Sequence, residues 1–109
     1  MKTERDYYID TKTVLSSTDR WTKGAYARTA TGEACQIVTD SHASCFCLQG
    51  ALYIASGRYS SSRLEHLAGK KLGPTQYMNP IASFNDMDTT SYEDVIGLLD
   101  EAIAELDPQ

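Results

Sequence analysis

The 109-residue sequence lacks the features that would place it directly in a functional class. No apolar run approaches the roughly 18 residues that a membrane-spanning helix requires, and the first residues form no apolar signal segment. There is no internal repeat, and neither of the glycine spacings that cradle phosphates, G-x-x-x-x-G-K and G-x-G-x-x-G, occurs. We therefore expect a single domain over residues 1–109 that works in the cytoplasm and does not bind a membrane.

Cysteine and histidine are scarce, and their spacing matches no common type of site. Three cysteines are an odd number, which favours reduced thiols when a secretion signal is absent. Cys45 and Cys47 would face away from each other on a helix, and with His42 they fall short of the four ligands of structural zinc. A cysteine nucleophile also needs a histidine base and an orienting group, and no such signature surrounds Cys47. We expect no metal and no cofactor, and we favour a non-enzymatic protein.

Lysine and arginine are absent from the last third of the chain. Residues 1–57 carry six basic and six acidic side chains, residues 58–75 carry four basic ones against Glu65, and residues 76–109 carry eight acidic ones. The basic middle should attract the acidic end, and the net charge of −5 disfavours direct binding of nucleic acid. The acids form either a solvated helix face or a docking surface for a basic partner. The predicted acidic face consists of Asp86, Asp88, Glu93, Asp94, Asp100, Glu101 and Glu105.

The spacing of apolar residues predicts a mainly helical α+β domain with one short β-hairpin. We expect the hairpin over Ala25–Ile37, with its turn at Thr29–Gly32 and a return strand at Glu33–Val38. Because an isolated hairpin is marginal in water, it should pack on a central helix. The predicted helices cover 11–17 with Asp10 as N-cap, 43–56, a third that Ser60–Ser62 cap and that ends at Lys71, a short turn from Pro80, and an amphipathic C-terminal helix with Thr90 and Glu93 as its capping box.

The same pattern predicts the core and the variable parts of the chain. Residues 1–9 are expected to be flexible, and residues 58–80 to form a variable loop or helix insertion. Apolar residues at helical spacing, together with the single tryptophan, should be buried. The predicted core consists of Val14, Leu15, Trp21, Leu48, Ala51, Leu52, Ala55, Leu98, Leu99, Ala102 and Ile103.

Gly50 and the pair Asn85-Asp86 have both structural and functional interpretations. Glycine inside a helix costs roughly 1 kcal/mol relative to alanine, so Gly50 predicts the close approach of another backbone, from the hairpin or the tryptophan. Asn85 and Asp86 are typical of a turn that starts a helix. Alternatively they form a polar groove beside the hairpin with Arg28 and Cys47, in which the guanidinium of Arg28 would suit an anionic ligand.

Three short segments place a bulky or polar anchor beside glycine or alanine, or at a turn. They are Trp21-x-x-Gly24-Ala25-x-Ala27-Arg28, Cys47-x-x-Gly50-Ala51-Leu52 and Phe84-Asn85-Asp86, the last followed by a Val95-x-x-Leu98-Leu99 helix. Together they resemble a family of small bacterial and bacteriophage proteins classed as a domain of unknown function. The resemblance runs from about Val14 to Leu106, although Phe84 replaces the family's usual tryptophan and residues 58–75 do not align. It implies a prokaryotic or phage setting and supplies no catalytic residues.

We expect a small acidic binding protein without enzymatic activity. It would be a phage or mobile-element accessory protein in a bacterial host cell, where it docks on a host defence protein with a basic surface and inhibits it. The seven tyrosines suit either such recognition or half-buried packing. The alternative is a binder or hydrolase of a small molecule or nucleotide, with a pocket near Arg28, Cys47, Asn85 and Asp86. The oligomeric state stays open.

Overall fold

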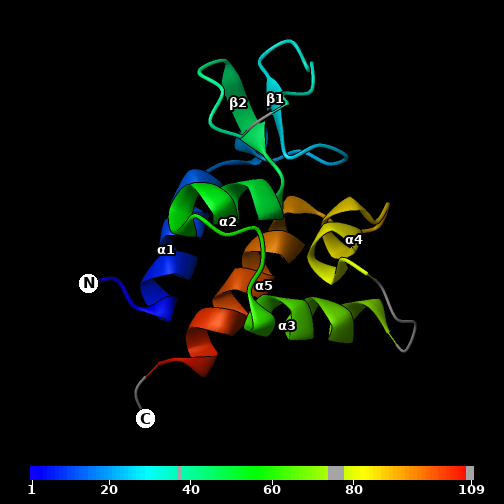
Figure 1. Ribbon diagram of the computed structural model, residues 1–109. Helices are drawn as coiled ribbons and strands as arrows, with labels where there is room; N and C mark the ends of the chain where they lie inside the picture. The colour runs from blue at the N-terminus through cyan, green and yellow to red at the C-terminus, as the bar shows by residue number, and fades with distance from the viewer. Residues whose placement is uncertain (37, 74–77, 108–109) are drawn as a thin grey trace.

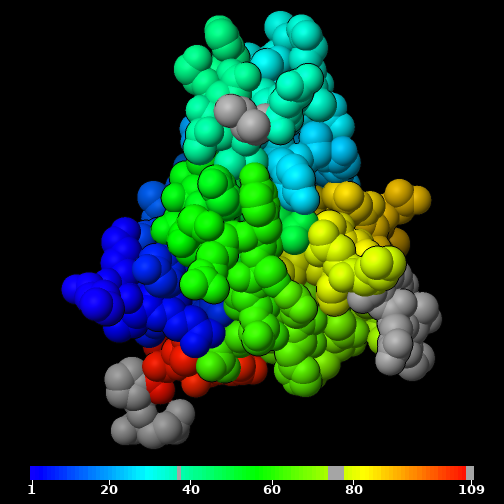
Figure 2. Space-filling model, in the orientation of Figure 1, coloured from blue at the N-terminus to red at the C-terminus, as the bar shows by residue number. Residues whose placement is uncertain are grey.

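Within residues 1–36, 38–73 and 78–107, which the computed structural model describes, five α-helices form one body and an antiparallel pair of strands projects from one end of it (Figure 1). In chain order the elements are α1 (Glu4–Val14), the 3-10 helix η1 (Thr18–Arg20), β1 (Ala27–Thr29), β2 (Ala43–Phe46), α2 (Leu48–Ser56), α3 (Ser62–Leu72), α4 (Pro80–Asp86) and α5 (Tyr92–Glu105). The hairpin projects above α2 (Figures 1 and 2), and α5 runs between α1 and α3 (Figure 1). The predicted small α+β architecture is confirmed.

The first helix begins well before the predicted position. Thr3 is its N-cap, and Thr3 and Asp6 form a capping box in which each side chain accepts a hydrogen bond from the backbone of the other. The buried side of α1 is made by Tyr8 and Thr11, which look polar in the sequence. The prediction of a helix over 11–17 with Asp10 as N-cap is therefore wrong.

The main partner of β1 is β2, not the predicted return strand. The antiparallel register pairs Ala27 with Phe46 and Arg28 with Cys45, and a bulge follows Arg28. Phe46 is buried while its strand neighbours are half-buried, so β2 fixes the hairpin on the helices through one large side chain.

The predicted turn at Thr29–Gly32 is present, and the chain does fold back after it. Thr29 N–H donates to the carbonyl of Glu33 over 2.8 Å, and Gly32 has the positive φ of 93° that the turn requires. Ala34 then forms an isolated bridge to Arg28 rather than a strand. Cys35 N–H also donates to the carbonyl of Ala27 at 2.9 Å, so the return segment does pair with β1, but the predicted strand over 33–38 is wrong for its described residues, and Ile37 lies outside them.

Helix α2 begins at Leu48 because residues 43–46 belong to β2. Cys47 is the N-cap, and its Sγ accepts a hydrogen bond from Gly50 N–H at 3.3 Å. The predicted start of this helix at Ala43 is therefore wrong. Its end is as the sequence implies, with Gly57 in the left-handed conformation at φ 78°.

Helices α3 and α4 follow their predicted signals. Ser61 caps α3, within the predicted run of serines, and Pro80 is the first residue of α4, after Asn79 as N-cap. Residues 74–77 of the predicted insertion lie outside the described part of the chain.

Helix α5 starts one residue later than predicted. Ser91 is its N-cap and forms a capping box with Asp94. The predicted box of Thr90 and Glu93 is wrong because the same pattern of hydroxyl and acid, three residues apart, occurs twice in succession. The buried stripe of α5 is Val95, Leu98, Leu99 and Ala102, as the helical spacing predicts.

The core lies where α1, α2, α3, α4 and α5 meet. Seven of the predicted core residues are buried, whereas Val14, Trp21, Ala55 and Ile103 are only half-buried. The buried seven are Leu15, Leu48, Ala51, Leu52, Leu98, Leu99 and Ala102. The predicted core lacked buried members of the helical stripes, such as Leu64 and Val95, and single aromatic or β-branched side chains outside a stripe, such as Tyr8, Phe46, Ile81 and Phe84.

Candidate functional site

Asn85 is fully buried and joins three separate segments of the chain. Its Oδ1 accepts hydrogen bonds from Trp21 Nε1 at 2.7 Å and from the backbone N–H of Leu48 at 3.0 Å. Its Nδ2 donates to the carbonyl of Thr22 at 3.1 Å and to Asp86 Oδ1 at 2.9 Å. All the polar atoms of this side chain are therefore engaged within the fold, which makes Asn85 a structural joint.

Asp86 extends the same joint to the loop after the tryptophan. Its Oδ1 also accepts from the backbone N–H of Gly24 at 3.0 Å, and Gly24 has a positive φ of 79°. From the same loop, the ammonium of Lys23 donates to the carbonyl of Met87. Two short segments that are far apart in sequence are thus tied side by side.

Gly50 lies against the backbone of the segment that leads into β1. A Cβ at this position would lie 2.1 Å from the carbonyl oxygen of Tyr26, the same oxygen that accepts from Cys47 N–H at 3.1 Å. The predicted close approach is confirmed, and the approaching backbone is the residue just before β1. Burial raises the pKa of the Cys47 thiol, so this sulfur is poorly suited to act as a nucleophile.

The guanidinium of Arg28 is directed at backbone carbonyls. Its Nε and Nη2 donate to the carbonyl of Lys23 at 3.4 and 3.1 Å, and its Nη1 donates to that of Gly32 at 3.0 Å. These contacts hold two turns on either side of β1. Arg28 therefore acts on the shape of the hairpin, and its donors are not directed toward Asn85.

A cavity of about 330 Å³ lies between the hairpin and the starts of α2 and α4, and we call it the hairpin groove. Of the four predicted groove residues, Cys47 and Asp86 line it, whereas Arg28 and Asn85 make the structural contacts described above. The other lining side chains include Tyr26, Cys35, Gln49 and Asn79. Two of the four residues that the sequence suggested for this groove therefore line it, and they are two of its nine lining residues.

Three tyrosines stack beside the hairpin groove. The rings of Tyr53 and Tyr59 are nearly parallel with centroids 4.4 Å apart, and the ring of Tyr26 is tilted against Tyr59 at 4.8 Å. The side chains of Tyr26 and Tyr59 remain exposed. Amphipathic rings in such a cluster pack against one another while their exposed parts stay at the surface.

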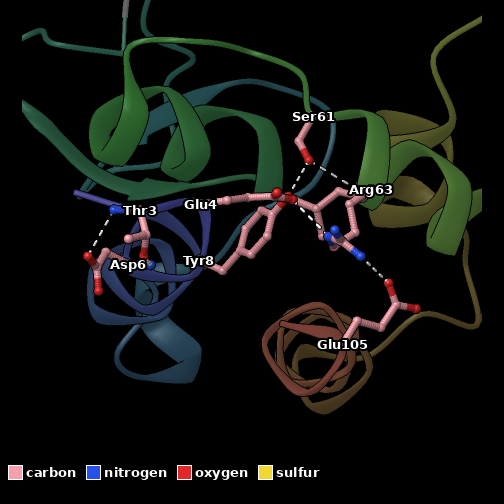
Figure 3. Close-up of polar contacts among 8 residues, drawn as sticks. Thr3, Glu4, Asp6, Tyr8, Ser61, Arg63 and Glu105 are labelled. Carbon is pink, nitrogen blue, oxygen red and sulfur yellow. Dashed lines mark hydrogen bonds and ion pairs between the residues drawn. The ribbon is translucent and has the colours of Figure 1, made fainter. Parts of the chain in front are cut away.

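A polar network that the sequence did not predict ties α1, α3 and α5 together (Figure 3). The buried Tyr8 hydroxyl donates to Glu4 at 2.6 Å and shares a hydrogen bond of 2.5 Å with Ser61. Arg63 donates to Glu4 at 2.8 Å and to Glu105 at 2.5 Å. We call these five residues the Arg63 network. It lines an open cavity of about 950 Å³.

The Arg63 network shifts the pKa values of its members in a consistent direction. The hydrogen bonds from Arg63 and Tyr8 lower the pKa of Glu4, and the two carboxylates raise that of Arg63. Burial, followed by the hydrogen bond to Glu4, raises the pKa of Tyr8 to about 12. Tyr8 therefore stays a neutral donor at physiological pH, which suits a structural contact rather than proton transfer.

The acids in the second half of α5 are paired with cations of the same chain. Each pair joins α5, or the turn after it, to α1 or α3. The pairs are Lys12–Asp100 at 2.6 Å, Lys71–Glu101 at 2.9 Å, Arg63–Glu105 at 2.5 Å and Arg5–Asp107 at 2.7 Å. The predicted attraction between the basic middle and the acidic end is present in the pairs of Arg63 and Lys71.

The acids around the start of α5 are arranged differently. Asp88, Glu93 and Asp94 have no ion-pair partner within the described residues, and the seven residues outside that description include no lysine, arginine or histidine. Asp94 caps the helix, whereas no hydrogen bond of the described chain engages the side chains of Asp88 and Glu93. This half of the predicted acidic face is the part with uncompensated charge.

A second cavity, of about 340 Å³, lies along the start of α5, and we call it the α5 groove. It is lined by Phe84 and Leu98 below and by carboxylates and an exposed methionine around them. The carboxylates belong to Glu93, Asp94 and Glu101, and the methionine is Met87. The one signal of this groove in the sequence is Gly97, a glycine in the middle of a strong helix.

The structure is a small α+β domain in which a buried apolar core is supplemented by side-chain hydrogen bonds to the backbone around Asn85 and by ion pairs between helices. The chain belongs to the family of unknown function DUF6197, which it matches over residues 1–105, as the resemblance in its motifs implied. No curated protein and no solved structure matches the chain. Of the helices that the structure describes, none has both the length and the apolar character needed to cross a membrane.

Proposed function

We propose that the protein is a non-enzymatic binding protein that docks on a basic partner protein through the start of α5. The observation that supports this is the division of the predicted acidic face. Asp100, Glu101 and Glu105 are neutralised by the chain's own cations, while Asp88 and Glu93 have no partner in the described residues. Uncompensated charge beside a groove attracts an oppositely charged protein and speeds its association.

The proposal also covers the origin of the protein and the kind of partner that it binds. We propose a phage or mobile-element accessory protein that inhibits a host defence protein, on the grounds of the family resemblance and the acidic surface. A partner whose basic surface normally holds nucleic acid would be blocked by such a surface.

Charge reversal tests the proposal. The wild type and the double variant Asp88→Lys/Glu93→Lys are immobilised and exposed to bacterial lysate at low and high salt. The matched control is Asp19→Lys/Glu33→Lys, which makes the same change in net charge at exposed sites away from α5. We expect a partner that the wild type and the control retain at low salt and that the α5 variant loses. The proposal is contradicted if all three proteins retain the same partner, or if the amount of partner retained does not change with salt concentration.

The hairpin groove supports a second candidate function, the binding of a small molecule. Its volume of about 330 Å³ and the free side of the Asp86 carboxylate favour a small ligand with hydrogen-bond donors. The buried Cys47 thiol and the engaged Arg28 argue against hydrolysis and against an anionic ligand. Thermal-shift measurements with a panel of amines and nucleotides test this, and stabilisation by nucleotides alone would contradict the expected preference.

A further inference from the structure

Gly97 lies in the interior of α5 at a place where the fold does not require glycine. Nothing in the described chain lies within 4 Å of a Cβ built at this position, and its φ is not positive. Glycine in a helix interior is destabilising relative to alanine. At Gly50 the approaching backbone of Tyr26 accounts for the same choice of residue, whereas at Gly97 no contact within the described chain does.

The space left by Gly97 belongs to the α5 groove, whose lining suits a long basic side chain. Phe84 and Leu98 are buried and supply an apolar floor for methylene groups. Met87, which is 37% exposed, supplies a flexible wall that adapts to different side chains. The carboxylates at the rim, among them that of Glu93, would receive the charged end.

One ammonium group of the chain itself already lines the α5 groove. Lys71 from α3 lines one end of the α5 groove, and its Nζ lies 2.9 Å from Glu101 Oε1. At the other end, Glu93 and Asp94 also line the groove, and no cation of the described chain pairs with them. Charge complementarity therefore favours a second cation at that end, supplied from outside the chain.

We propose that the α5 groove receives a lysine or arginine side chain of a partner protein, which lies over Gly97 with its charged end at Glu93 and Asp94. The proposal rests on the proposed function and names the element of the partner that is recognised. The missing Cβ at residue 97 leaves room for the methylene stem, so shape as well as charge selects the ligand.

Titration with a hexaarginine peptide, followed by the backbone amide signals in NMR, tests the groove. We expect a saturable change centred on Gly97, Met87 and Glu93, and a much smaller one with hexaglutamate. Changes that centre instead on the paired acids Asp100 and Glu105 would overturn the assignment, because they would indicate exchange of surface ion pairs.

A larger side chain at residue 97 tests the contribution of the groove's shape without changing its charge. Gly97→Leu places a side chain in the proposed binding space, and Gly69→Leu is the matched control on α3, since Gly69 also has nothing within 4 Å of a Cβ. We expect Gly97→Leu to weaken hexaarginine binding about tenfold or more, while the control stays within about twofold of the wild type. Circular dichroism verifies that both fold, and Gly97→Ala replaces Gly97→Leu if the latter does not.

The outcomes distinguish this inference from the proposed function. In one outcome, Gly97→Leu binds hexaarginine as the wild type does while Asp88→Lys/Glu93→Lys does not. That result supports docking through the acidic start of α5 and contradicts the binding of a basic side chain over Gly97. If the wild type binds hexaarginine no better than hexaglutamate, both proposals are wrong.

Discussion

Two regions differ in how far contacts within the chain account for their polar and small residues. One is the set of contacts that Asn85 and Gly50 make below the hairpin, and the other is the start of α5. At the joint, Asn85 makes four hydrogen bonds to its surroundings and Gly50 makes room for a backbone carbonyl. At the start of α5, Glu93 has no partner and Gly97 has open space beside it within the described chain. A residue whose contacts are complete inside the fold is accounted for by folding. Open space beside a glycine does not by itself imply a ligand, since Gly69 has the same space, but at Gly97 the space lies next to carboxylates without an ion-pair partner in the described chain, and this combination supports the proposed docking site.

The largest loss of stability is expected at Gly50, where a substitution tests whether the fold requires glycine. Gly50→Ala would place a methyl group 2.1 Å from the carbonyl oxygen of Tyr26, so the hairpin or α2 must move. Because backbone atoms on both sides are fixed by hydrogen bonds, we expect a loss of about 4 kcal/mol in the free energy of unfolding. Urea denaturation measures it, and a loss below about 1 kcal/mol would contradict the rigid joint.

The second effect concerns Asn85. Asn85→Ala leaves Trp21 Nε1 and the buried N–H of Leu48 without their acceptor, and we expect a loss of about 3 kcal/mol. Asp86→Asn is the control, since its amide oxygen still accepts from Gly24 N–H, and it should cost less than about 1 kcal/mol. Equal losses in the two variants would show that Asn85 is not the centre of the joint.

A smaller effect is expected at the Arg63 network. Tyr8→Phe removes the hydroxyl that joins Glu4 and Ser61, which should cost about 1 kcal/mol at pH 7. In the wild type the fold raises the pKa of Tyr8 from 10.0 to about 12. This contribution to stability is complete below pH 10 and is lost as the pH rises toward 12, because the unfolded chain releases the proton first.

Unfolding in urea at pH 8 and at pH 11 measures that dependence. The wild type should lose stability between the two pH values, and Tyr8→Phe should lose less. Identical pH dependence of the two proteins would show that the Tyr8 proton is not held by the network.

The smallest expected effect is a gain in stability at Gly97, in contrast to the loss expected at Gly50. Gly97→Ala adds a methyl group where the described chain leaves space, so α5 gains helix propensity and the protein should gain about 0.5–1 kcal/mol. Thermal unfolding measures the gain. A destabilised variant would mean that Gly97 is needed by the fold, and the proposed ligand of the α5 groove would then lose its support.

The parts of the fold that the sequence predicts well are those with local signals. The start of α4 at Pro80, the cap of α3 within Ser60–Ser62 and the buried stripe of α5 all follow from residues within a few positions of one another. The close approach at Gly50 was also predictable, because a glycine inside an apolar helix costs stability unless a neighbouring backbone needs the space. The hairpin was one of the two predicted sources of that backbone, and the structure assigns the contact to Tyr26, 24 positions earlier in the sequence, which the pattern alone did not single out.

The parts that were missed depend on contacts between distant residues. Strand β2 is short and rich in small side chains, so its strand conformation comes from pairing with β1 rather than from its own propensity. The buried side of α1 contains Tyr8, which looks polar in the sequence and whose hydroxyl finds Ser61 only after folding. The α5 groove likewise forms where three elements meet, so Gly97 was visible in the sequence but its surroundings were not.

The position of Arg63 has a consequence for the order in which the chain folds. One of its ion pairs reaches 59 residues back to Glu4, and the other reaches 42 residues forward to Glu105. Contacts across such long loops form late, because the entropy of closing each loop must be overcome before the contact stabilises anything. Interactions made after the transition state slow unfolding and leave the folding rate almost unchanged. We therefore expect substitution of Arg63 to speed unfolding more than it slows folding.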